Sequence, residues 1–103
     1  MKLILLLALL LFSFAALAAA QNPGKANFAS KCALCHGPDG KGSTSIGKSL
    51  KIADLQSPDV QKLSDDDFKT VIANGKNKMP PFKGKLTDAQ VLQVISYIRE
   101  LGK

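Results

Sequence analysis

The chain has 103 residues, a formal net charge of +6 and a pI near 9.5, and it is too short for more than one domain. Its two cysteines are too few for the disulfide framework that staples many small exported domains. The basic excess alone would allow nucleic acid or anionic lipid as a partner. No basic stretch is interleaved with aromatic residues, so we expect no nucleic-acid partner.

Residues 1–20 have the pattern of a secretory signal peptide. A basic start at Met1-Lys2 precedes a leucine-rich and then alanine-rich run, and Ala18-Ala19-Ala20 fits the A-x-A cleavage rule. We predict cleavage after Ala20, which leaves residues 21–103 as one exported domain. The alternative is an uncleaved anchor, because the apolar run is just long enough to span a bilayer.

The first elements of the exported domain are a short helix and a long loop. Asn22-Pro23 predicts a helix start, and this helix reaches about Ala33 with Phe28 on its buried face. Residues 36–50 are rich in Gly, Ser, Lys and Asp, which predicts a loop.

Two further helices are predicted in the middle of the chain. Ser57-Pro58 starts a short helix through Lys62, and Ser64-Asp65-Asp66-Asp67 has the S-x-x-D pattern of a capping box. The helix after this box carries an apolar face and stops at Asn74-Gly75. The residues expected on that face are Phe68, Val71 and Ile72.

The last helix is predicted from Asp88 to about Leu101. It follows a proline- and lysine-rich loop over 76–85 and begins with a T-x-x-Q capping box at residues 87–90. Its apolar residues recur at helical spacing: Val91, Leu92, Val94, Ile95, Ile98 and Leu101. No window alternates like a strand, so we expect an all-α domain of four to five short helices. Its long loops are expected to pack around a bound group, because long loops without secondary structure are uncommon in compact domains.

The chemistry is concentrated in one stretch, KCALCHGPDGKG, which holds both cysteines and the only histidine. A structural zinc site needs four ligands, and no second ligand pair exists. A redox C-x-x-C motif follows a strand in an α/β fold, and no strand is predicted. C-x-x-C-H is the attachment signature of c-type haem, in which Cys32 and Cys35 bind the vinyl groups and His36 lies under the iron.

A six-coordinate iron needs a second ligand, and Met79 is the methionine that remains after the predicted cleavage. A lone methionine often only fills a core. Met79 instead lies in a polar loop, NGKNKMPPF, where Pro80 and Pro81 restrict the backbone. His/Met ligation of haem raises its reduction potential.

Taken together, these motifs resemble a small class I monohaem cytochrome c, of the bacterial periplasmic and cytochrome c6-like kind. FASKCALCHGPDGKG resembles the first helix and haem-binding turn of that family, and VIANGKNKMPPFKGKLTDAQVLQVISYIREL resembles its methionine loop and last helix. The resemblance implies the cytochrome c fold around one covalent haem c, with iron ligated by His36 and Met79. It also implies that the first and last helices cross where the following residues meet: Gly24, Phe28, Val94 and Tyr97.

One departure from the family concerns the stretch after the haem motif. Many members have a proline there, whose carbonyl accepts a hydrogen bond from the proximal histidine, but residues 43–48 contain none. A carbonyl near Ile46 or Gly47 is expected to replace it, since a ligating histidine generally has a partner for its second nitrogen. The partners of the haem propionates stay open, with Arg99 as the only arginine.

The expected activity is transfer of single electrons by a soluble, monomeric carrier that is not an enzyme. Lysines around Met79 would steer it to an acidic docking surface on redox partners, including membrane complexes as transient partners: Lys76, Lys78, Lys83 and Lys85. We expect the periplasm, with a thylakoid lumen or an anchored form facing the periplasm as alternatives. The alternative functions are a haem subunit tethered to an oxidase or dehydrogenase, a peroxidase or gas-binding haem protein if Met79 does not ligate, and, more distantly, a thiol oxidoreductase.

Overall fold

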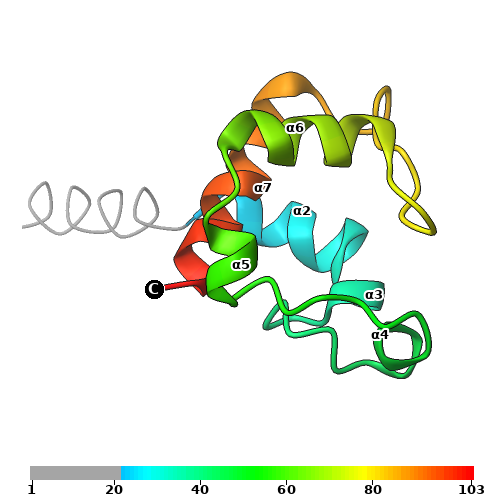
Figure 1. Cartoon of the computed structure of the whole chain (residues 1–103). Helices are drawn as coiled ribbons and strands as arrows, with labels where there is room; N and C mark the ends of the chain where they lie inside the picture. The colour runs from blue at the N-terminus through cyan, green and yellow to red at the C-terminus, as the bar shows by residue number, and fades with distance from the viewer. Residues whose placement is uncertain (1–21) are drawn as a thin grey trace, which may run out of the picture.

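The computed structural model describes residues 22–103, which form six helices (Figure 1). These are α2 (Gly24–Lys31), α3 (Ala33–His36), α4 (Ser45–Ser49), α5 (Pro58–Gln61), α6 (Asp65–Asn74) and α7 (Asp88–Leu101). Between residues 22 and 103 there is no strand, only the isolated bridges Lys76–Met79 and Lys83–Leu86. The prediction of an all-α fold is confirmed, with one or two more helices than expected. The predicted signal peptide, residues 1–20, lies outside the described residues.

The first predicted helix is divided into two. The Asn22 side-chain oxygen accepts a hydrogen bond of 2.9 Å from the Gly24 N–H, so the helix starts just after the predicted Asn-Pro pair. α2 ends at Lys31, and a turn at Cys32 (φ −118°) leads into α3. The haem motif therefore lies on a short separate helix at a bend.

The prediction of a continuous loop over residues 36–50 is wrong, because α4 forms within it. Thr44 has extended backbone angles, and its hydroxyl accepts a hydrogen bond from the Gly47 N–H. This is the N-cap arrangement that starts a helix. The composition of this stretch, rich in Gly, Ser, Lys and Asp, predicted a loop, and the single cap at Thr44 was not recognised.

The capping boxes predicted from the sequence are confirmed. Ser64 and Asp67 cap α6, and Thr87 and Gln90 cap α7, each pair with both reciprocal hydrogen bonds. α6 ends at Gly75, whose φ of 75° is a conformation that favours glycine.

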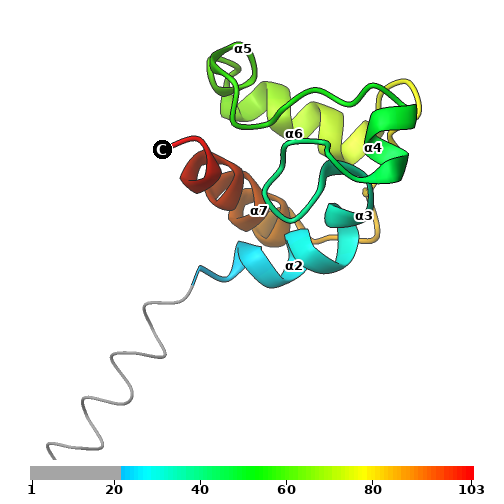
Figure 2. The same cartoon turned by 90° about the horizontal axis from the view of Figure 1, so that it is seen from below.

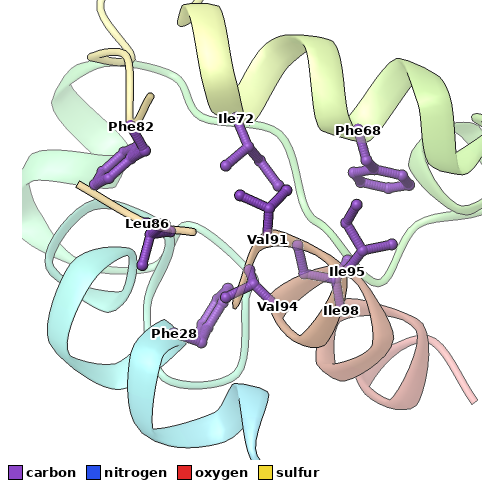
Figure 3. Packing of buried hydrophobic residues seen from close by; sticks show 9 residues of the cluster. All are labelled: Phe28, Phe68, Ile72, Phe82, Leu86, Val91, Val94, Ile95 and Ile98. Atoms are coloured by element: carbon purple, nitrogen blue, oxygen red, sulfur yellow. The ribbon is translucent and has the colours of Figure 1, made fainter. Parts of the chain in front are cut away.

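The core lies where α7 packs against both α2 and α6 (Figures 1 and 2). Figure 3 shows its nine buried side chains: Phe28, Phe68, Ile72, Phe82, Leu86, Val91, Val94, Ile95 and Ile98. Leu92 was predicted among them but is 46% exposed, because each helical residue is rotated by about 100° from the last. Val91 and Ile95 face inward, which turns Leu92 toward solvent.

The crossing of α2 and α7 matches the expectation from the family. A Cβ on Gly24 would lie 2.0 Å from the Gln93 carbonyl oxygen, so only glycine allows this approach of the two backbones. The Phe28 and Tyr97 rings lie 5.2 Å apart at 58°, a favourable tilted arrangement. None of the helices between residues 22 and 103 is long and apolar enough to cross a membrane.

Candidate functional site

A cavity of about 640 Å³ brings together the four residues predicted to bind haem: Cys32, Cys35, His36 and Met79. The first three come from the α2–α3 bend and the last from the α6–α7 loop. Figures 1 and 2 show that loop, in yellow, on the same side of the molecule as α3 and α4. The cavity has the size of a cofactor pocket, about 300–1,000 Å³. Apolar side chains supply much of its wall: Leu34, Leu50, Ile52, Ala53, Val71, Pro80 and Phe82.

The two cysteines are half-buried and are not joined to each other. Burial, and then the neighbouring Cys35, raises the pKa of the Cys32 thiol to about 11. Thiol oxidoreductases require the opposite, a lowered pKa that produces thiolate. Within residues 22–103, no group of three or more His, Cys, Asp or Glu side chains could hold a metal ion. The raised pKa of Cys32 argues against the thiol-redox alternative.

His36 lies in the cavity wall with one ring nitrogen unsatisfied. Burial lowers the pKa of its imidazole, which favours the neutral form that binds metals. Nδ1 is buried and has no hydrogen-bond partner among residues 22–103. The expectation of a carbonyl near Ile46 or Gly47 is therefore wrong. Those two carbonyls accept hydrogen bonds from the N–H groups of Leu50 and Ile52, in α4 and the turn after it.

The backbone around His36 is held by hydrogen bonds. The His36 N–H donates to the Cys32 carbonyl at 2.9 Å, and the His36 carbonyl accepts from the Gly42 N–H at 2.7 Å. The Thr44 hydroxyl donates to the Cys35 carbonyl at 3.1 Å. The main chain on both sides of His36 is therefore held in place.

Met79 lies at the end of a tight turn that closes on itself. The Lys76 N–H donates to the Met79 carbonyl at 3.2 Å, and the Met79 N–H donates to the Lys76 carbonyl at 2.9 Å. Asn77, between them, has a φ of 53°, a left-handed conformation that Asn tolerates. A Cβ on Gly75 would lie 2.6 Å from the Met79 carbonyl oxygen. The turn is therefore packed directly on the end of α6.

These residues suit a covalently attached haem. The cavity offers two thiols for attachment, an imidazole with a buried unpaired nitrogen, a soft thioether and an apolar wall. Arg99, the only arginine, does not line the cavity. Its guanidinium donates to the Gln61 and Leu63 carbonyls and to Asp65 at 2.6, 2.6 and 2.9 Å.

The predicted lysines divide into two pairs. Lys76 and Lys78 line the cavity, whereas Lys83 and Lys85 are exposed but do not line it. Two further lysines that were not predicted, Lys31 and Lys51, also lie in the wall. The position of Lys31 directly before Cys32 was a usable signal, but that of Lys51 depends on α4.

Comparisons with known proteins show the family to which the chain belongs. Residues 19–98 match the family described as cytochrome C oxidase, cbb3-type, subunit III. Cytochrome c6 of Nostoc sp. is 39% identical over 97% of this chain and 89% of its own, and cytochrome c6 of Synechocystis sp. is 38% identical over 81% and 67%. The solved structure of the KustC0563 c-type cytochrome superposes with a TM-score of 0.72 at 32% identity, covering 78% of this chain and 98% of its own. With its single C-x-x-C-H motif and all-α fold, the chain belongs to the cytochrome c family as a small monohaem member.

Proposed function

We propose that this protein is an exported electron carrier whose haem is held by Cys32 and Cys35 and ligated by His36 and Met79. Membership of the cytochrome c family makes it a single-electron carrier with one covalently bound haem c. The assignment of individual residues is supported by one observation above all. Thiols, imidazole and thioether from two distant parts of the chain line a single apolar cavity.

The bound haem supplies an iron that gains and loses one electron, and the protein supplies ligands, a dry pocket and a docking surface. The turn at Met79 has two reciprocal backbone hydrogen bonds and rests on Gly75. These contacts support the proposal because they restrain the backbone that carries the Met79 thioether. Little of the chain needs to rearrange when an electron arrives, which suits a carrier.

An enzyme or a gas-binding protein would need a haem iron whose sixth coordination position is open. In the proposed carrier, Met79 occupies that position. The test is an optical spectrum of the exported holoprotein, oxidised and reduced, with and without carbon monoxide. We expect a low-spin c-type spectrum with a ferric methionine–iron band that carbon monoxide does not change. A high-spin spectrum, or a shift on adding carbon monoxide, would favour the peroxidase or gas-binding alternative.

The docking surface in this proposal surrounds the cavity mouth. Lys76 and Lys78 lie in its wall, joined by Lys31 and Lys51, while Lys83 and Lys85 extend the basic charge along the same loop. The acidic first turn of α6, Asp65–Asp67, lies at the other end of that helix from the Met79 turn (Figure 1). Such a charge separation would orient the cavity toward an acidic partner.

The exported location rests on the predicted cleavage after Ala20. Intact mass of the protein from the periplasmic fraction tests it, with the mass of residues 21–103 plus one haem expected. The full-length mass in the membrane fraction would contradict it.

A second candidate function is that of a haem subunit held in an oxidase complex, because the matching family is described as an oxidase subunit. Purification in mild detergent distinguishes the two. A free monohaem protein supports the carrier, and stable co-purification with an oxidase supports the subunit.

A further inference from the structure

The hydroxyl of Thr44 joins α4 to the haem-binding turn. It accepts a hydrogen bond of 2.9 Å from the Gly47 N–H, which caps α4, and it donates one of 3.1 Å to the Cys35 carbonyl. The capping hydroxyls of the helices that start after α4 make only the first kind of bond within residues 22–103: Ser57, Ser64 and Thr87. Thr44 is therefore the cap with a second partner, and that partner is the peptide group between Cys35 and His36.

Gly47 brings the α4 backbone into contact with the same turn. A Cβ on Gly47 would lie 2.5 Å from both the Cys35 and the Gly42 carbonyl oxygens. Gly42 in turn donates its N–H to the His36 carbonyl at 2.7 Å. α4 thus rests on the backbone on both sides of His36.

This contact matters because the His36 ring lacks the partner that usually orients a ligating histidine. In metal sites, the second ring nitrogen generally donates to a carbonyl or carboxylate, which fixes the ring orientation. Here Nδ1 is buried without a partner among the described residues. The direction of the imidazole must then follow from the placement of its backbone.

We propose that Thr44 and Gly47 are positioning residues that set the orientation of the His36 imidazole through the Cys35–His36 peptide. This inference rests on the proposed function, in which His36 is an axial ligand. It assigns α4, a helix absent from the sequence-based prediction, a role in holding the proximal ligand.

The test compares Thr44→Val with Thr87→Val in the holoprotein. Both substitutions remove a capping threonine hydroxyl, and only the first also removes the bond to Cys35. We expect both variants to lose stability toward urea, and Thr44→Val to lose more, because it also leaves the Cys35 carbonyl without its hydroxyl partner. Only Thr44→Val should shift the haem-methyl and His36 ring signals in the proton NMR spectrum of the ferric protein, together with the reduction potential.

Thr44→Ser is the rescue, because it keeps the hydroxyl, and its NMR spectrum and potential should match those of the unaltered protein. Thr44→Asp keeps an acceptor for the Gly47 N–H but cannot donate to Cys35 when ionised. It should therefore fold and show the altered NMR pattern even if Thr44→Val yields no holoprotein. Gly47→Ala should favour α4 as a helix, because alanine is the stronger helix former. Reduced haem incorporation in this variant would therefore come from the added Cβ, which would lie 2.5 Å from the Cys35 and Gly42 carbonyl oxygens.

Unchanged haem-methyl and His36 signals in Thr44→Val or Thr44→Asp would overturn the inference, as would an equal shift in Thr87→Val. Those results would leave Thr44 as a helix cap alone. A different result would contradict the proposed function itself: the absence of a histidine signal among the hyperfine-shifted resonances of the unaltered holoprotein.

Discussion

The two parts of the cavity wall that carry the predicted iron ligands are built in different ways. The His36 side is local, since the thiols and the imidazole lie within five residues at a bend supported by α4. The Met79 side is a turn between two helices, closed by its own backbone hydrogen bonds and packed on Gly75. The comparison teaches that the position of His36, the proposed proximal ligand, is set by short-range chain geometry, whereas that of Met79 depends on a turn between helices.

The largest expected effect is on the His36 side. His36→Ala removes the imidazole on which the proposed haem site depends, so we expect almost complete loss of stable holoprotein. The measurement is the yield of covalent haem protein after export and its optical spectrum. A normal yield with a low-spin spectrum would show that the local motif is not the proximal site.

Phe28→Ala should weaken both sides together, because Phe28 is 1% exposed in the core that joins α2 to α7. We expect the free energy of unfolding to fall by about 3–5 kcal/mol, measured by urea denaturation of the holoprotein. Leu92→Ala is the control on α7, since Leu92 is 46% exposed. Its effect should stay within about 0.5 kcal/mol, and equal losses would contradict the assignment of the core.

Met79→Ala should affect the distal side alone. The haem should stay attached through Cys32 and Cys35, while the reduction potential falls because a His/Met pair raises it. Carbon monoxide binding to the reduced protein should change from undetectable to stoichiometric. A potential equal to that of the unaltered protein would mean that another residue, such as a lysine of the same loop, is the sixth ligand.

Gly75→Ala should loosen Met79 without removing it. Gly75 and Gly84 both have positive φ angles, 75° and 84°, so alanine at either strains the backbone by about 1–3 kcal/mol. Only at Gly75 would the added Cβ meet the Met79 turn, at 2.6 Å from its carbonyl, whereas nothing lies within 4 Å at Gly84. We expect partial carbon monoxide binding in Gly75→Ala and none in Gly84→Ala. The same binding in both would show that the contact does not hold the turn.

The smallest effect concerns charge around the cavity. Lys76→Gln with Lys78→Gln should slow association with an acidic redox partner a few-fold at low ionic strength, measured by stopped-flow. Lys62→Gln with Lys103→Gln removes equal charge from residues outside the cavity wall and should slow it less. Equal slowing by both pairs would mean that net charge, and not the lysines at the cavity, governs the encounter.

Much of the fold could be predicted because its signals are local. The capping boxes at Ser64 and Thr87 are hydrogen bonds between residues three apart, so a short local sequence pattern is enough to predict them. The crossing at Gly24 was implied by the family resemblance, and the structure confirms it. α4 was missed because its signal is a single threonine in a stretch whose composition favours a loop.

For this protein, the sequence by itself determined the all-α class, the positions of the helix caps and the set of two thiols, one imidazole and one thioether. The tertiary structure alone decided that these groups line one cavity, that Lys31 and Lys51 join its wall and that Arg99 does not. It also decided that the His36 Nδ1 has no partner among residues 22–103, while the Thr44 hydroxyl donates to the neighbouring Cys35 carbonyl. The physical reason is the sequence separation of the interacting residues. Caps and motifs involve residues a few positions apart, whereas a cavity wall is formed by distant chain segments that only tertiary packing brings together.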